Sequence, residues 1–247
     1  MNFKQYLDST YLKTPSQAGL TEAENTIIAK EFIQEAIDEN FKLIMIRPDI
    51  VTLANKMITE SKSPVQIGTV IDFPEGKGGL EAKLAEANQA IQDGADDLDF
   101  VCNYEAFKAG NVDLVKEEIL KCTQFGLANS KVVKWIIEVA ALTDKHIMQL
   151  SALIKNLVIT HFKEENYASV FVKSSTGFFK TENNLPNGAT VPAIIIMLEN
   201  ANPLPVKAAG GVRTYEEAVE MIRLGVKRIG TSGAKAIANG QKADGGY

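Results

Sequence analysis

Short apolar segments rich in β-branched residues alternate with longer amphipathic segments along the whole chain. This alternation is typical of strands that follow helices in turn. We predict eight strands, over Tyr6–Thr10, Leu43–Ile46, Gln66–Ile71, Asp97–Val101, Val132–Ile137, Ser169–Lys173, Pro205–Ala208 and Arg228–Thr231. The amphipathic segments predict helices over Glu22–Glu39, Gly79–Asp93, Val112–Gly126, Asp144–Asn156, Ala189–Asn200 and Thr214–Leu224.

Strands in turn with helices form βαβ units and a parallel sheet. Eight strand candidates in 247 residues predict an α/β protein, a single-domain (β/α)8 TIM barrel over 1–247 with a short mobile tail from about 239 to 247. The alternative is an open doubly wound sheet. Its glycine-rich turn after the first strand is missing, and Gly76-Lys77-Gly78-Gly79 lacks the Ser or Thr that completes a phosphate-binding P-loop.

Composition narrows the classes of function. Asp plus Glu number 31 against 26 Lys plus Arg, and a net charge of −5 argues against nucleic-acid binding. The longest apolar run, Ala193–Leu198, is too short to span a membrane, and no secretory signal is visible, so we expect a cytoplasmic protein. Two cysteines are too few for a disulfide framework, and two histidines exclude a multi-histidine metal site, although a carboxylate-only Mg²⁺ site stays open.

Two lysines stand where a barrel places its active site, at the carboxyl ends of strands. Lys173 ends the sixth predicted strand, and Lys207 lies at the corresponding level of the seventh. Either lysine alone could simply reach water at the rim. Neighbouring strands, however, lie about 4.8 Å apart, and two ammonium groups at about 4 Å repel by roughly 4 kcal/mol at an effective dielectric of 20. Such repulsion lowers the pKa of one lysine, and its neutral amine can form a Schiff base with a carbonyl.

Acidic residues on the fourth predicted strand could balance these lysines. Alternation puts Asp97 and Asp99 on the same face, and an inward Asp99 would need a partner that the lysine pair can supply. The alternative is an outward charge at the start of the strand, which suits Asp97 better than Asp99. Lys134 and Asp8 are expected to point inward too, either as site residues or as members of structural ion pairs.

Glycines lie around the ends of the last three predicted strands. Gly177, Gly210, Gly211 and Gly230 let backbone N–H groups approach an anion, and a phosphate site after the seventh and eighth strands is common in barrels. Arg213 either adds positive charge to this site or is a solvated residue. Two lysines, a carboxylate and a phosphate pocket together indicate a Schiff-base aldolase that acts on a sugar phosphate without a metal or other cofactor.

Seven segments, in this order, carry a resemblance to a known family: YLDSTYLK, IGTVIDFPEG, GADDLDFV, VKWIIEVAALTD, FVKSSTGF, VKAAGGVRTYEEA and RIGTSGA. Over nearly its whole length the chain resembles the deoxyribose-phosphate aldolases. The resemblance implies a (β/α)8 barrel that reversibly cleaves 2-deoxy-D-ribose 5-phosphate to D-glyceraldehyde 3-phosphate and acetaldehyde, in the breakdown of deoxyribonucleosides. It also implies a homodimer or homotetramer whose ligands are sugar phosphates and aldehydes, without nucleic-acid or membrane partners.

The resemblance also implies roles for single residues. Lys173 matches the lysine that forms the Schiff base, Lys207 the lysine that perturbs it and moves protons, and Asp99 the acid of a proton relay through water. Lys134 matches a strand lysine near the relay, and Asp8 and Thr176 match polar positions near the sugar hydroxyls. The phosphate positions are matched by Gly177, Gly210, Gly211, Gly230 and Ser232.

The chain departs from the family pattern at several positions. Ser9 replaces the usual histidine after Asp8, and Gly233 replaces a serine after Ser232, which leaves one hydroxyl fewer for a phosphate. Cys102 follows the fourth strand, where a free thiol near the site could react with aldehydes. Tyr247 ends the chain, and either reaches the site or is a disordered tail residue. The alternatives to this assignment are another Schiff-base aldolase or transaldolase, and a barrel that only binds phosphate.

Overall fold

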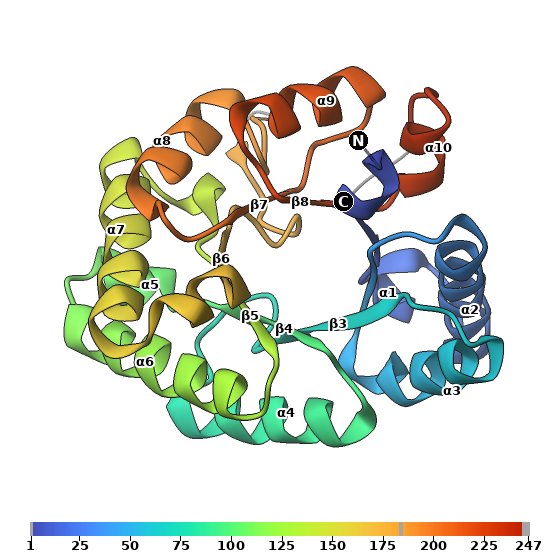
Figure 1. The fold of residues 1–247 in the computed structure, drawn as a ribbon, viewed down its shortest axis with the longest axis horizontal. Helices are drawn as coiled ribbons and strands as arrows, with labels where there is room; N and C mark the ends of the chain where they lie inside the picture. Colours follow the sequence, from blue (N-terminus) through green and yellow to red (C-terminus); the bar gives the residue numbers. More distant parts are fainter. Residues whose placement is uncertain (1, 183–184, 244–247) are drawn as a thin grey trace.

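Parallel strands close into a barrel in the computed structural model, which describes residues 2–182 and 185–243. In this part of the chain the strand order is β1-β2-β3-β4-β5-β6-β7-β8, and β8 pairs with β1 to close the sheet (Figure 1). The predicted TIM barrel is therefore confirmed. The strands are β1 Leu7–Tyr11, β2 Leu43–Ile46, β3 Gln66–Ile71, β4 Asp97–Val101, β5 Val132–Ile136, β6 Val170–Lys173, β7 Val206–Ala209 and β8 Arg228–Thr231.

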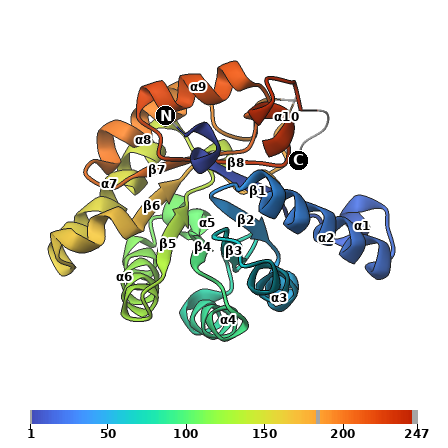
Figure 2. The ribbon, with the colours of Figure 1, turned by 45° about the vertical axis from the view of Figure 1, so that its right-hand side comes forward.

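Helices surround the strands on the outside (Figures 1 and 2). They are α1 Pro15–Ala18, α2 Glu22–Glu39, α3 Val51–Ser61, α4 Gly79–Asp93, α5 Tyr104–Lys108, α6 Val112–Ala128, α7 Asp144–His161, α8 Val191–Ala201, α9 Tyr215–Leu224 and α10 Ala234–Ala238. Short 3₁₀ helices cover Phe3–Tyr6, Pro48–Ile50, Val139–Ala141 and Glu164–Ser169. The strand predictions agree to within one residue at each end, whereas α1, α3, α5 and α10 were not predicted. Helices α1, α5 and α10 have only four or five residues and carry little periodicity.

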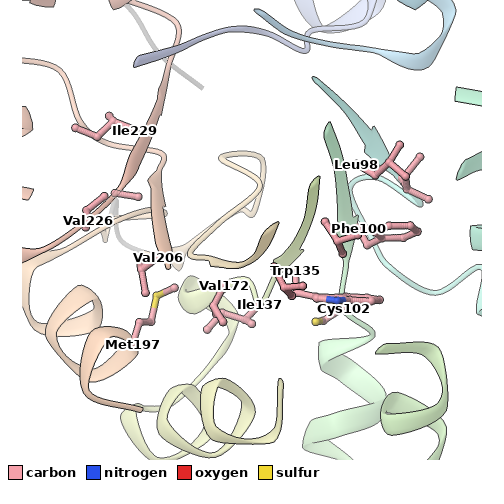
Figure 3. Packing of buried hydrophobic residues seen from close by; sticks show 14 of the residues in the cluster. Leu98, Phe100, Cys102, Trp135, Ile137, Val172, Met197, Val206, Val226 and Ile229 are labelled. Atoms are coloured by element: carbon pink, nitrogen blue, oxygen red, sulfur yellow. The ribbon is translucent and has the colours of Figure 1, made fainter. Parts of the chain in front are cut away.

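The main hydrophobic core lies between the strands and the helices. Outward residues such as Leu98, Phe100 and Trp135 pack there (Figure 3), and the Phe100 and Trp135 rings stack with centroids 5.1 Å apart. Cys102 belongs to this outer layer (Figure 3). Burial raises the pKa of its thiol, which therefore stays protonated and unreactive. The expectation that Cys102 offers a reactive thiol to the site is wrong.

Inside the barrel, two halves differ in polarity. Apolar side chains from β2 and β3 fill one half together with Leu12, and Leu43, Met45 and Val70 are completely buried there. Gly68 belongs to this half because an added Cβ would lie 2.5 Å from the Met45 Cε atom. The other half is charged. Its fully or almost fully buried members are Asp8, Asp97, Asp99, Lys134, Lys173, Lys207 and Arg228.

A second buried charge cluster lies outside the barrel wall, between α4 and α6. The Lys83 ammonium group is completely buried and donates to Glu118 Oε2 at 2.8 Å, to Asp72 Oδ2 at 2.9 Å and to the Gly76 carbonyl at 2.9 Å. Asp72 opens the β3–α4 loop, so this cluster ties the loop to the two helices. The loop carries Phe73 to the barrel mouth, where its ring meets Phe178 edge-on.

Candidate active site

Three ammonium groups converge on one carboxylate inside the barrel. The Nζ atoms of Lys134, Lys173 and Lys207 lie 2.6, 2.8 and 3.2 Å from oxygens of Asp99. Strand register explains the convergence, because Lys173 pairs with Lys207 across β6 and β7, and Asp99 pairs with Lys134 across β4 and β5. The structure thus brings together the two lysines and the carboxylate that the sequence singled out.

Below this group lies a second layer of charges, toward the amino ends of the strands. Asp8 accepts from Arg228 Nε at 2.7 Å and lies 2.6 Å from Lys207 Nζ. Asp97 lies 2.7 Å from Lys134 Nζ and 3.4 Å from Arg228 Nη2. Asp97 is therefore an inward charge, and its alternative interpretation as an outward one is wrong. Arg228 was missed, although an arginine that opens an apolar strand was a visible signal.

Electrostatics distinguish Lys173 from its neighbours. Burial lowers the pKa of Lys173 to about 8, Lys207 and Lys134 act in the same direction, and Asp99 opposes them. Burial therefore outweighs the lysine–lysine repulsion from which we predicted the shift. Burial alone would raise the pKa of Asp99, but the three surrounding lysines hold it well below its usual range. Near pH 7 roughly one tenth of the Lys173 side chains are therefore neutral amines, 2.8 Å from the ionised Asp99 carboxylate.

A pocket opens above Lys173 at the carboxyl ends of the strands. It is lined by Thr10, Leu12, Lys173, Thr176, Ala209, Gly210, Gly211, Val212, Arg213, Gly230, Thr231, Ser232 and Ala243. Gly210 and Gly211 have φ angles of 78° and 82°, a conformation that side chains disfavour. Gly230 leaves room for Lys207, whose Cε would lie 3.2 Å from an added Cβ. Four of the five predicted phosphate positions line this pocket, while Gly177 lies behind Gly210.

Asp8 and Lys134 do not reach the pocket. Both side chains are completely buried, and their partners are the charged groups of the barrel interior. Thr176, by contrast, lines the pocket beside Lys173. The structure therefore favours a supporting role for Asp8 and Lys134 rather than contact with a sugar hydroxyl.

The chain's carboxyl-terminal part closes one side of the pocket. Ala243 is buried, donates its N–H to the Arg213 carbonyl at 2.9 Å and packs against Gly233. A serine in place of Gly233 would collide with the Ala243 methyl group, so this departure from the family pattern makes room for the tail. Of the tail expected to be mobile, residues 244–247, including Tyr247, lie outside the described residues.

Glu138 is a buried acid at the site that sequence reasoning missed. It follows β5 with a left-handed φ of 56°, and its Oε2 accepts from the Thr176 N–H at 3.2 Å and from the Thr176 hydroxyl. Burial raises its pKa to about 7. Its signal was available in the sequence, because a lone acid follows the apolar end of a predicted strand.

Neither a metal cluster nor a membrane span is found in the described part of the chain. Among residues 2–182 and 185–243, no group of three or more His, Cys, Asp or Glu side chains could hold a metal ion. The inward carboxylates of the barrel already face lysine or arginine. Within the same residues, no helix is long and apolar enough to cross a membrane.

Comparisons with known proteins agree with this geometry. A family model described as "DeoC/LacD family aldolase" matches residues 6–240. The deoxyribose-phosphate aldolase of Thermococcus gammatolerans is 36% identical over 98% of this chain and 97% of its own length. An aldolase named QR15 superposes with a TM-score of 0.79 at 30% identity, over 97% of this chain and 95% of that one. A tetrameric deoxyribose phosphate aldolase from Aeropyrum pernix gives 0.77 at 25% identity, over 96% and 89%.

Proposed function

The chain belongs to the DeoC/LacD family of aldolases and is an enzyme, and from that premise we propose that it cleaves 2-deoxy-D-ribose 5-phosphate reversibly through a lysine Schiff base. The products are D-glyceraldehyde 3-phosphate and acetaldehyde. One observation carries the proposal: Lys173 is a buried amine with a pKa lowered to about 8, at the floor of a glycine-lined pocket. A neutral amine at this position can attack a carbonyl.

Lys173 forms the covalent intermediate. Its neutral Nζ attacks C1 of the open-chain sugar, and loss of water gives an iminium ion. The iminium draws the electrons of the C2–C3 bond toward nitrogen when that bond breaks. Lys173 lines the pocket yet is only 2% exposed, so the intermediate would be shielded from bulk water.

Proton transfer is assigned to Asp99 and Lys207. Breaking the C2–C3 bond requires removal of the proton of the C3 hydroxyl, which becomes the aldehyde of glyceraldehyde 3-phosphate. Asp99, through a water molecule and Lys207, takes this proton. A proton is then returned to C2 of the enamine, and hydrolysis of the resulting imine releases acetaldehyde and regenerates Lys173. The 3.2 Å contact between Lys207 and Asp99 supports one connected relay.

The phosphate is assigned to the far side of the pocket. Gly210, Gly211, Gly230 and Ser232 line it and leave room for backbone N–H groups to approach an anion, and Arg213 adds a positive charge. Gly177 supports this wall from behind, within 3.6 Å of an added Gly210 Cβ. Thr176 faces the sugar hydroxyls next to Lys173.

The biological setting is inferred from the same reaction. We assign the enzyme to deoxyribonucleoside catabolism in the cytoplasm, as a single domain that needs no metal or organic cofactor. A homo-oligomer, either dimer or tetramer, is proposed because a family member from Aeropyrum pernix is described as tetrameric.

Borohydride trapping with acetaldehyde tests the central step. Reduction of the imine should leave an ethyl group on the peptide that contains Lys173, and the label should be lost in Lys173→Leu. Absence of an adduct, or label only on scattered surface lysines, would favour a barrel that merely binds phosphate. The relay is tested separately, because Asp99→Asn should lose about 10²–10⁴-fold in turnover. Near-normal turnover of that variant would remove Asp99 from the relay.

A further inference from the structure

The charged groups beneath Lys173 form a closed ring of three cations and three carboxylates, and Lys173 is attached to this ring from outside. Each contact joins a cation to a carboxylate, with distances of 2.6 Å from Arg228 to Asp8, 2.6 Å from Asp8 to Lys207 and 3.2 Å from Lys207 to Asp99. The ring continues over 2.6 Å from Asp99 to Lys134, 2.7 Å from Lys134 to Asp97 and 3.4 Å from Asp97 back to Arg228. Lys173 lies outside this ring and joins it only at Asp99, at 2.8 Å.

The ring balances its own charge. Each of its three carboxylates meets two of its three cations, so the fully ionised ring sums to zero. Lys173 is a fourth cation for which no carboxylate is left over. Because burying an uncompensated charge is costly, the group that gives up its proton should be this additional one.

The pKa values of Lys134, Arg228 and Lys173 agree with this balance of charges. Burial lowers the pKa of Lys134 and of Arg228, but the neighbouring carboxylates outweigh it and raise both values. At Lys173 burial prevails, and the pKa is lowered to about 8. The same buried surroundings therefore keep Lys134 and Arg228 charged, whereas they bring the pKa of Lys173 close enough to neutral pH for part of it to lose its proton.

We propose that Arg228 is a positioning residue that keeps Lys173 nucleophilic by closing the charge ring. The Asp97 carboxylate has the opposite effect on Lys173, because it adds a negative charge to the ring. Arg228 contacts neither Lys173 nor the part of the pocket where the sugar would bind. Arg228 acts through its ion pairs with Asp8 and Asp97. Without it, the ring would carry a net charge of −1, and this charge would favour the protonated form of Lys173. This role rests on the proposed Schiff-base function and adds a determinant to it.

Other charged groups also act on the pKa of Lys173, and the test must distinguish their effect from that of Arg228. Asp99 on β4, Lys134 on β5 and Lys207 on β7 surround its amine, and Glu138 acts on it from the end of β5. Glu138 titrates near neutral pH and would contribute to any pH profile. All variants are therefore compared in a Glu138→Gln background as well as in the native chain.

Two single variants with opposite charge changes test the ring. Arg228→Met removes a cation, and the midpoint for deprotonation of Lys173 should rise by about one pH unit, a tenfold loss of neutral amine near neutral pH. Asp97→Asn removes a carboxylate and should lower the midpoint by a similar amount. The double variant restores the balance and should return close to the native midpoint, as should Arg228→Lys.

The measurement does not depend on catalysis. Competitive acetylation with acetic anhydride across pH, followed by quantification of the Lys173 peptide, reports its deprotonated fraction directly. The acidic limb of the kcat/KM profile for 2-deoxyribose 5-phosphate should move by the same amount. A merely structural role would weaken folding in both single variants without moving the midpoint in opposite directions.

The direction of the two midpoint shifts decides whether the ring controls Lys173. Shifts of opposite sign that cancel in the double variant support the ring, and shifts of the same sign, or none, overturn it. If Arg228→Met does not fold, the downward shift of Asp97→Asn against an unchanged Arg228→Lys still tests the charge count. If the shifts occur but acetaldehyde and borohydride leave no label on Lys173, the Schiff-base function fails while the ring stands.

Discussion

Two lysines of this barrel, Lys83 and Lys173, are buried almost equally, yet the pKa of one is raised and that of the other is lowered. Lys83 is completely buried, and Lys173 is 2% exposed. Burial lowers the pKa of both, but at Lys83 Glu118 and Asp72 outweigh it and raise the pKa above its usual value. At Lys173 burial is joined by two other lysines, and the pKa falls to about 8.

The difference lies in the number of carboxylates per ammonium group. Lys83 has two carboxylates to itself, whereas Lys173 shares Asp99 with Lys134 and Lys207. Burial is thus not sufficient to make a lysine nucleophilic, since a buried lysine with enough counter-charge is a structural cation. Lys83 therefore anchors a loop, whereas Lys173 has the lowered pKa that the proposed chemistry requires.

The largest effect should follow from removing the lysine with the lowered pKa. Lys173→Met should reduce kcat/KM by about 10⁴-fold or more, because no other lysine in the described site lines the pocket. Steady-state cleavage of 2-deoxyribose 5-phosphate measures this. Lys83→Met, assayed below its unfolding temperature, should keep the borohydride-trapped adduct, and loss of the adduct in that variant would contradict the distinction between the two lysines.

Lys83→Met should instead affect stability. It leaves the Glu118 and Asp72 carboxylates without their cation, which should lower the free energy of unfolding by about 3–5 kcal/mol. Denaturant titration measures this. The matched control is Lys116→Met, whose partner Asp113 is exposed, and its effect should stay within about 0.5 kcal/mol. Equal effects of the two substitutions would show that Lys83 is not a structural cation.

Glu138 extends the comparison to an acid whose described hydrogen-bond partners are uncharged. Its folded-state pKa of about 7 exceeds the ordinary 4.5, so the folded protein binds this proton more tightly than the unfolded one. The contribution to stability is complete below pH 4.5 and is lost as pH rises through 7.

Glu138→Gln keeps an acceptor for Thr176 but removes this titration. Relative to the native protein, the variant should gain as much as about 3 kcal/mol in free energy of unfolding between pH 5 and pH 8. Paired urea titrations at the two pH values measure the gain. A difference between the two proteins that does not change with pH would mean that Glu138 is already ionised throughout this range.

The smallest effect is expected at an exposed cation. Arg213 lines the pocket but is exposed to solvent, so its charge is screened. Arg213→Gln should raise KM for 2-deoxyribose 5-phosphate by about tenfold with little change in kcat. KM for unphosphorylated 2-deoxyribose is the control and should not change. A rise for both sugars would place Arg213 elsewhere than at the phosphate.

Much of the barrel could be predicted because each of its elements has a local signal. The strands are short β-branched segments, and their ends agree with the structure to within one residue. Helices α1, α5 and α10 gave no comparable signal, because four or five residues present too few turns to establish a period. Lys173 and Lys207 were visible as candidates because each interrupts an apolar strand at the end where barrels place their chemistry.

Other parts of the site depend on neighbours that are distant in the sequence. Glu138 and Thr176 are 38 positions apart, and Arg228 lies 131 positions from Asp97, so no local pattern connects them. Cys102 shows the converse. It follows the strand that carries Asp99, but the end of β4 directs it into the outer core.

By itself, the sequence determined the alternation of strands and helices, the closed barrel, and the lysines and carboxylate from which a Schiff-base site could be predicted, because periodicity and residue chemistry are local properties. Only the tertiary structure decided which charges neutralise one another. Strand register and barrel closure bring β1, β4, β5, β7 and β8 together around one ring and leave Lys173 of β6 as the unbalanced cation. Electrostatic energies depend on distances and burial in three dimensions, so the charge balance around Lys173 appears only in the folded chain.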